Sequence, residues 1–262
     1  MTHSNTMIAT SVEGADLSDC AFHGTFDEKL AGTRDFFEVY PGLRKKGQLL
    51  YASEKFILIP DIAPVTTDHL LLVPRDHVPS FSSVPSPLKS EAAAIISASV
   101  SKMQAFHPES EILAFEHGVG QIRGHTIRCG GCGRTDHAHL HLLPIPKGSN
   151  PNMGRTISEE ISRCIGIEAK TFPPLPELNF GAVAGQQPYL YMWSSRMSSA
   201  LLFVQASVKM SVPSQLIRRL LATEMLGVAE NEPDRWDWRD YVIFHTSAGE
   251  KKVSDTLTRW RR

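Results

Sequence analysis

The sequence predicts an α+β fold, in which an antiparallel sheet of about five strands is packed with helices and is followed by a C-terminal α+β extension. Three observations support this prediction. Apolar strand-like runs are joined by short turns, one long segment carries apolar residues at helical spacing, and a similar order of strands and helix returns after residue 150. The chain has 262 residues and is 42% hydrophobic, enough for one large or two small domains.

The strands of the predicted sheet are short apolar runs that end at turn residues or at proline. A turn at 53–55 joins the first two runs, and Pro74 ends the third. Residues 88–106 have apolar side chains three or four positions apart, so they are expected to form a helix that packs on the sheet. The five expected strands are residues 49–51, 56–59, 69–73, 111–116 and 137–143.

The second half of the chain predicts a smaller set of elements. A helix is expected at 156–165, a β-hairpin at 188–194 and 200–207, and a helix at 213–226 that opens at Ser211 or Ser214. These elements either form an internal pseudo-repeat or an extra layer that covers the sheet. The predicted organisation is a flexible arm at 1–18, a first domain at 19–150 and an extension at 151–262 that covers the core.

Charge and cysteine content limit the partners and the compartment. Lys and Arg total 27 against 28 Asp and Glu, so no global field attracts nucleic acid or an anionic membrane, and any phosphate recognition must be local. The N-terminal stretch has no basic segment followed by an apolar one, which argues against a secretory signal. Four cysteines are too few for a disulfide scaffold, so we expect a cytoplasmic protein without membrane spans.

The most informative motif is the alternation of histidine with apolar residues at positions 137–142. A strand has a period of two, so His137, His139 and His141 would project from one face and their apolar neighbours from the other. Each buried imidazole needs a hydrogen-bond partner, so three in a row are improbable as mere core residues. Two chemistries fit this pattern, namely metal binding and nucleophilic catalysis by histidine.

The same run, His-x-His-x-His followed by two apolar residues, resembles the signature of the histidine-triad superfamily. Three upstream stretches resemble further family motifs in the same order. Residues 60–64 are similar to the ribose-binding turn, 68–78 to a segment ending in Pro-x-x-His, and 115–118 to a polar turn before the phosphate loop. The resemblance covers about residues 20 to 146 and implies that 19–150 is a histidine-triad-like catalytic domain.

The resemblance implies the roles of three histidines. His139, the middle one, would attack the α-phosphorus of a nucleotide and form a covalent nucleotidyl-histidine. His141 and His69 would contact the phosphate or support the charge that develops on it. The chemistry is sound, because a neutral imidazole is a competent nucleophile near pH 7 when an oxygen partner holds its other nitrogen as a donor. For His69, an ordinary histidine before an apolar strand is the alternative.

The glycine-rich stretch before the triad is a candidate phosphate loop. Its glycines allow successive amides to turn inward as an anion-binding nest, and an arginine adds a charged donor. An ordinary glycine loop is the alternative, but the position beside His139 favours phosphate binding. The candidate substrate-binding residues of this loop are Gly131, Gly133, Arg134 and Thr135.

Asp61 matches the acidic residue that the family uses to accept hydrogen bonds from ribose hydroxyls. The residues themselves leave a second interpretation open, because an Asp between two prolines commonly forms an Asx turn. We expect Asp61 to bind the ribose, with the Asx turn as the alternative.

A zinc site is also implied by the resemblance, since several family members carry a Cys-x-x-Cys pair near residue 20. The predicted structural tetrahedron is therefore Cys20, His23, His77 and His137. Here His23 stands in place of the second cysteine, which zinc tolerates because imidazole and thiolate are both good ligands. A rival pair with the same two-residue spacing, Cys129 and Cys132, lies in the presumed phosphate loop.

These observations predict an enzyme, a nucleotidyl hydrolase or transferase. Its substrate would be a nucleoside phosphate, a dinucleoside polyphosphate or a nucleotide-activated small molecule. A nucleotide-binding protein without turnover is the alternative, and the near-neutral charge argues against a nucleic-acid enzyme. We expect a monomer, with a dimer as the alternative, because an appended layer could complete the site within one chain as a partner subunit does in simpler family members.

Overall fold

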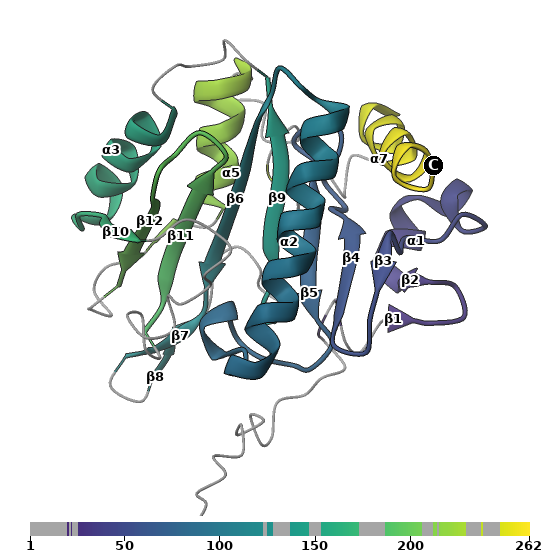
Figure 1. The fold of residues 1–262 in the computed structure, drawn as a ribbon, viewed down its shortest axis with the longest axis horizontal. Coiled ribbons are helices and arrows are strands. Elements are labelled where there is room, and N and C mark those ends of the chain that lie inside the picture. Colours follow the sequence, from purple (N-terminus) through teal and green to yellow (C-terminus); the bar gives the residue numbers. More distant parts are fainter. Residues whose placement is uncertain are drawn as a thin grey trace, which may run out of the picture.

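The computed structural model describes residues 20, 22, 26–122, 125–127, 137–146, 153–172, 187–205, 212–213, 215–228, 237 and 247–262. An eight-stranded antiparallel sheet forms the centre of these residues, in the order β10-β12-β11-β6-β9-β5-β4-β3 (Figure 1). Its strands are β3 (Tyr51–Ala52), β4 (Phe56–Pro60), β5 (Leu70–Pro74), β6 (Glu111–Gly118), β9 (Leu140–Ile145), β10 (Lys170–Phe172), β11 (Tyr189–Ser194) and β12 (Ala200–Val204).

Helices and shorter elements surround this sheet. The α-helices are α1 (Arg34–Val39), α2 (Ser86–Phe106), α3 (Met153–Ile165), α5 (Leu216–Leu220) and α7 (Ser247–Trp260). Two 3-10 turns and one π-helical turn are η2 (Pro41–Leu43), η3 (Phe81–Ser83) and η4 (Leu221–Met225). Two small hairpins pair β1 (Phe26–Asp27) with β2 (Gly32–Thr33), and β7 (Gly120–Ile122) with β8 (His125–Ile127).

The predicted α+β class is confirmed, but the predicted count of about five strands is wrong, because the extension adds three strands to the same sheet. The expected hairpin is formed by β11 and β12, and β11 also pairs along β6, from Gly118 opposite Tyr189 to Leu113 opposite Ser194. Without this pairing β6 would be an exposed edge with unpaired backbone groups. Residues 115–118, expected as a turn, are therefore the end of β6.

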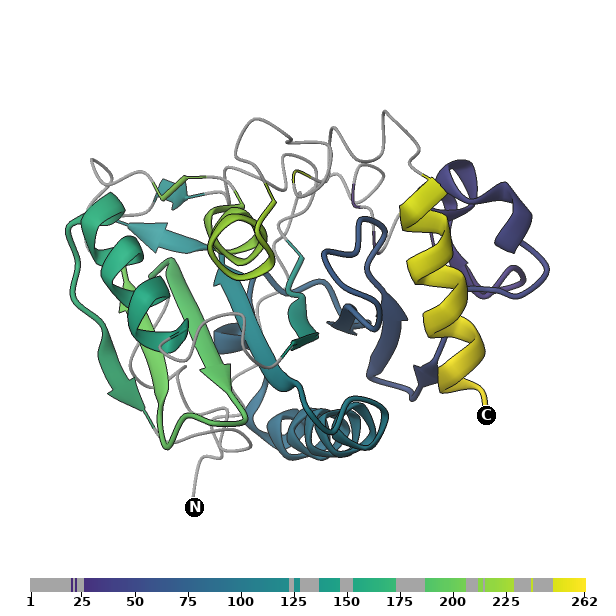
Figure 2. The same ribbon diagram turned by 90° about the horizontal axis from the view of Figure 1, so that it is seen from above.

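One face of the sheet is covered by the long helix α2 (Figure 2). Apolar residues three or four positions apart in α2 pack on the sheet, among them Ile96, Val100 and Met103. Leu140 and Leu142 of β9 project into this core, as the alternation in the sequence predicts. This face is a continuous apolar layer, and it fixes which side of β9 remains for the histidines.

The opposite face of the sheet is covered in two parts. Helices α3 and α5 pack over the half that contains β6, β11 and β12 (Figure 2). Phe22 and Phe26 pack over the half that contains β4 and β5. Helix α7 lies beside α1 at that second half (Figure 1). Polar side chains at the ends of the central strands therefore lie between two groups of covering segments, and these groups come from distant parts of the chain.

The helix expected at 213–226 begins at Leu216 instead, after Gln215, whose φ of 55° is left-handed. Ser211 and Ser214, the expected first residues, lie outside the described residues. Strands from both sides of residue 150 share one sheet, so the division at that position stays a prediction. In the part of the chain that the structure describes, no helix is both long and apolar enough to cross a membrane.

Candidate active site

Three polar side chains meet on the second face of the sheet, where β4, β5 and β9 lie side by side. Asp61 directly follows β4, His69 directly precedes β5, and His141 lies within β9, opposite Leu71 in the strand register. Alternate residues of a strand share a face, so each of these residues points away from α2. We name Asp61, His69 and His141 the histidine–aspartate cluster.

Short contacts join the members of this cluster. His69 Nε2 lies 2.9 Å from His141 Nδ1, and each of these atoms lies 3.4 Å from Asp61 Oδ2. The Val65 amide donates to His69 Nδ1 at 3.2 Å. A neutral imidazole has one donor and one acceptor nitrogen, so the proton of His69 resides on Nε2 and is directed at His141 and Asp61.

Both carboxylate oxygens of Asp61 have partners inside the protein. Oδ1 accepts a hydrogen bond from the Ala63 amide at 2.7 Å, which is the geometry of an Asx turn. Oδ2 accepts from Arg218 Nη1 at 2.8 Å, and Asp61 is only 3% exposed. Binding of ribose by Asp61 stays a prediction, and this geometry favours the Asx turn that the sequence left open.

Burial and charge determine the protonation states in this cluster. Burial alone would raise the pKa of Asp61, but the Arg218 guanidinium and the two imidazoles together hold that pKa well below its usual range. Burial lowers the pKa of His69 well below its usual value and that of His141 to about 4, although Asp61 opposes both shifts. At pH 7 the cluster therefore holds an ionised Asp61 and two neutral histidines.

Arg218 is the residue of this region whose role the sequence did not reveal. The sequence offers Arg218, with Lys209 and Arg219, as a candidate contact from the second half of the chain, and a solvated helix face is the ordinary interpretation of such charges. Instead Arg218 is 5% exposed and donates to Asp61 and to the Ala63 carbonyl. Its neighbours in the chain offered a signal, because an arginine within a run of apolar residues is typical of a buried cation.

His139 lies beside this cluster and is only half-buried. Its Nδ1 is 2.8 Å from the carbonyl oxygen of His137. A carbonyl can only accept, so Nδ1 carries the proton and Nε2 keeps its lone pair. The ring centroid of Phe22 is 5.5 Å from that of His139, and the Phe115 ring stacks on His141 with centroids 4.3 Å apart. His139 thus has the tautomer that a nucleophilic imidazole needs.

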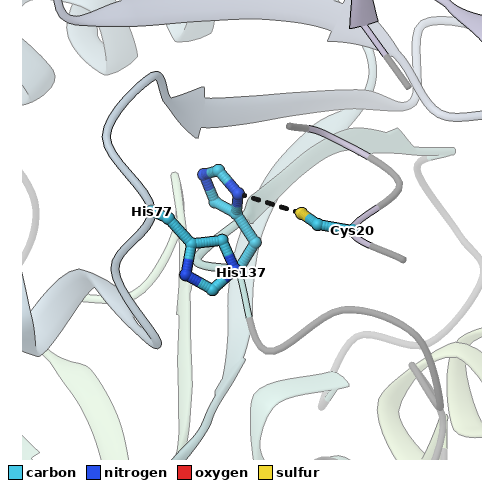
Figure 3. Close-up of side chains that lie close together, drawn as sticks. All are labelled: Cys20, His77 and His137. Atoms are coloured by element: carbon cyan, nitrogen blue, oxygen red, sulfur yellow. Dashed lines mark hydrogen bonds between the residues drawn. The ribbon is translucent and has the colours of Figure 1, made fainter. Parts of the chain in front are cut away.

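A second group, which we name the cysteine–histidine cluster, consists of Cys20, His77 and His137 (Figure 3). The Cys20 sulfur and one nitrogen of each ring all lie within 4.8 Å of one another. His137 Nε2 donates to the Pro74 carbonyl at 2.7 Å, so the unprotonated Nδ1 faces Cys20 Sγ at 3.3 Å. This set of donors suits zinc, and a ligating histidine typically donates its other nitrogen to such an oxygen.

The three histidines of the motif do not all lie in a strand, contrary to the prediction. Strand β9 begins at Leu140, so His137 and His139 precede it. The reason is that this segment binds the chain after β5, since the Ala138 amide donates to the Val78 carbonyl at 2.7 Å and His137 binds Pro74. The three rings consequently point to different neighbours, although their apolar partners share the core against α2.

Several predicted site residues lie outside the described residues. They are His23 of the predicted metal site, the phosphate-loop residues Gly131, Gly133, Arg134 and Thr135, and the rival cysteines Cys129 and Cys132. Their assigned roles stay predictions.

The comparisons with known proteins agree with this geometry. Residues 35–156, just under half of the chain, match the family model described as "Scavenger mRNA decapping enzyme C-term binding". This region belongs to the histidine-triad superfamily. The resemblance drawn from the motifs is thereby confirmed for this part of the chain. The search of curated proteins found no match.

Solved structures similar to this chain are distant in sequence. A hypothetical histidine triad nucleotide-binding protein from Sulfolobus tokodaii shares 20% identity, with 44% of this chain and 69% of that chain covered and a TM-score of 0.30. Yeast Ap4A phosphorylase in complex with Ap4A shares 14% identity, with 84% and 79% covered and a TM-score of 0.39. TM-scores this low do not establish a common fold, so the family assignment rests on the matched region and its motifs.

Proposed function

We propose that this protein is a nucleotidyl hydrolase or transferase. Its substrate would be a nucleoside phosphate, a dinucleoside polyphosphate or a nucleotide-activated small molecule. The observation that carries the proposal is the hydrogen bond from His139 Nδ1 to the His137 carbonyl at 2.8 Å, which leaves Nε2 as a nucleophile on a half-buried ring. The matched family is named for an mRNA decapping enzyme, which supports a nucleotide substrate.

The proposed reaction has two displacement steps at the α-phosphorus. In the first, His139 Nε2 forms a bond to phosphorus while the bond to the leaving oxygen breaks, and the leaving group takes the electron pair and then a proton. In the second, the oxygen of water or another acceptor bonds to phosphorus, loses its proton, and the phosphorus–nitrogen bond breaks to restore neutral His139. The neutral His141, whose Nδ1 accepts from His69, carries its proton on Nε2 and suits the role of N–H donor to developing negative charge, while His69 supports it by fixing this tautomer.

Asp61 receives a revised role in this proposal. Its carboxylate, paired with Arg218, holds the rings of His69 and His141 in place and compensates any positive charge that they acquire. The ribose would then be bound by other groups. Phosphate contacts are still assigned to Gly131, Gly133, Arg134 and Thr135, on the strength of the sequence alone.

We further propose that Cys20, His77 and His137 bind a structural zinc ion, with His23 as the fourth ligand. The support is the convergence of a thiol and two ring nitrogens within 4.8 Å, together with the Pro74 carbonyl that fixes the tautomer of His137. A bound zinc ion would cross-link the N-terminal segment to the chain just before β9. Its role would be to hold the main-chain carbonyl of His137 that orients His139.

The protein is proposed to act as a monomer in the cytoplasm. Strand β11 pairs along β6 and so occupies the sheet edge at which a strand of a second copy would otherwise pair. Light scattering of the full chain tests this proposal, and a stable dimer would contradict it.

The decisive experiment follows the products and the covalent intermediate together. The protein is incubated with a panel of nucleotides and dinucleoside polyphosphates, with and without inorganic phosphate, and the products are identified by mass. Peptide mapping of protein rapidly quenched in alkali then locates any bound nucleotide, because a phosphorus–nitrogen bond to histidine hydrolyses in acid. A nucleotide adduct on His139 supports the proposal, whereas binding of nucleotides with neither adduct nor product supports the alternative, a nucleotide-binding protein without turnover.

A further inference from the structure

We propose that the C-terminal helix α7 positions the histidine–aspartate cluster by holding the loop 61–69, which connects β4 to β5 and begins and ends with two members of that cluster. The inference rests on the proposed function and adds residues that act through His69. These residues lie far from His69 in the sequence, and none of them was singled out by the motifs. They belong to the last helix of the chain, within residues 252–260.

One face of α7 binds this loop through its polar side chains. Lys252 Nζ donates to the carbonyl oxygens of Pro64 and Val65 at 3.2 and 3.0 Å. One turn further along, Thr256 Oγ1 accepts from the Asp68 amide at 2.8 Å. Residues four apart lie on the same side of a helix, so these contacts form one continuous polar edge. The edge follows the loop towards His69.

Asp68 is the central anchor of this arrangement. It is fully buried and has a φ of 64°, a left-handed conformation that non-glycine residues rarely adopt. Its Oδ1 accepts from Trp260 Nε1 at 3.1 Å, and its Oδ2 accepts from Arg259 and lies 2.5 Å from His107 Nε2. Such a backbone conformation persists only when the surroundings hold it. The residue that directly precedes His69 is thus held in its unusual conformation by α7.

The main-chain carbonyl groups of residues 62–65 are also held by side chains. All four accept hydrogen bonds from side chains of other segments. Tyr40, directly after α1, donates to the first at 2.6 Å, Arg218 of α5 donates to the second, and Lys252 of α7 donates to the last two. The amide at the end of this stretch in turn donates to His69 Nδ1. The loop therefore takes its shape from distant helices, and that shape determines which nitrogen of His69 carries the proton.

Two variants of α7 test this positioning role, with a matched control on the same helix. Thr256→Val removes the acceptor of the Asp68 amide together with the bond that the same hydroxyl donates to the Lys252 carbonyl within the helix. Arg259→Gln removes the charge beside Asp68. Lys251→Gln is the control, because Lys251 is exposed and pairs with Asp255 one turn along the same helix. We measure kcat and KM with the best substrate of the nucleotide panel, hydrogen exchange at the Asp68 amide, and the ring-nitrogen chemical shifts of His69.

In both test variants we expect kcat to fall between about tenfold and a hundredfold while KM changes less than about twofold, because the loop displaces catalytic rings and not the substrate-binding groups. Exchange at Asp68 should accelerate in Thr256→Val, and the shifts of His69 should move towards a mixture of tautomers. The control should keep the wild-type values. Thermal unfolding identifies variants that fail to fold, and Thr256→Val, which loses only the two hydrogen bonds of one hydroxyl, remains informative in that case.

The inference is overturned if kcat in Thr256→Val equals that of the control, or if the control loses as much activity as the test variants. Failure of the proposed function has a different signature, namely wild-type protein that forms neither product nor adduct with any nucleotide. The exchange and chemical-shift measurements need no substrate. Unchanged values in both test variants would then overturn the positioning role by themselves.

Discussion

The two polar clusters on the second face of the sheet differ in how their charge is balanced. The histidine–aspartate cluster contains its own cation, because Arg218 binds the Asp61 carboxylate at 2.8 Å within the protein interior. The cysteine–histidine cluster instead directs a thiol and two ring nitrogens at one another, a set that a metal cation would complete. Both contain two histidines, yet the first is held by a salt bridge and the second is suited to a metal.

This difference shows that the number of histidines in a cluster does not by itself identify a metal site. A metal ion at Asp61 would have to displace a guanidinium that already neutralises the carboxylate, whereas Cys20 and His137 face each other through atoms that are good zinc ligands. His139 lies between the two clusters. Its Nδ1 is tied to the main chain of the cysteine–histidine cluster, and its ring is 5.1 Å from that of His141.

The largest expected effect is on turnover, from a change at His139, which lies between the two clusters. His139→Ala should lower turnover by about a hundredfold or more, because it removes the nucleophile while both clusters remain. Nucleotide binding and the thermal midpoint should stay close to those of the wild type. The check is steady-state turnover together with equilibrium binding of the same nucleotide. Unchanged turnover would show that His139 is not the nucleophile and that it does not connect the two clusters in function.

Arg218→Met tests the salt bridge of the first cluster. It leaves Asp61 buried without its cation, so the free energy of unfolding should fall by about 3–5 kcal/mol. Arg155→Met is the control, because it breaks an exposed pair with Glu159 and should leave the free energy of unfolding close to that of the wild type. Urea denaturation measures both. Addition of Asp61→Asn to Arg218→Met should recover part of the lost stability. If Arg218→Met loses no more stability than the control, the Arg218–Asp61 pair does not hold this cluster.

Metal analysis tests the second cluster. Gently purified protein should contain about one zinc per chain, as expected of a single tetrahedral site. Cys20→Ser should release the ion and lower the thermal midpoint, whereas Cys164→Ser, a change at the other cysteine among the described residues, should do neither. Zinc that survives the loss of Cys20 but not that of Cys132 would move the site to the loop cysteines.

A smaller effect is expected from pH. The pKa values of His69 and His141 are lowered by burial, the latter to about 4, so the unfolded chain binds protons at these positions before the folded protein does. Stability should therefore be complete above about pH 6.5 and should fall as the pH drops towards 4, by about 3 kcal/mol for His141. Urea midpoints across this window measure the slope. A His141→Gln variant should have a shallower slope, and an equal slope would assign the effect to other groups.

The local elements follow from the sequence because their causes are local. Helix α2 and strands β4, β5 and β6 lie close to the predicted segments, since apolar spacing and turn residues act over a few positions. The hairpin of β11 and β12 was predicted for the same reason. The alternation around His139 also predicted correctly that Leu140 and Leu142 enter the core.

The sequence by itself determined the family motifs, the α+β class and the candidate nucleophile. Only the tertiary structure decided that the extension joins the sheet, that Arg218 neutralises Asp61, and that α7 holds the loop before His69. The last two of these contacts join residues more than 150 positions apart. No spacing rule reports them, because hydrogen bonds and ion pairs form between groups that only the folded chain brings together.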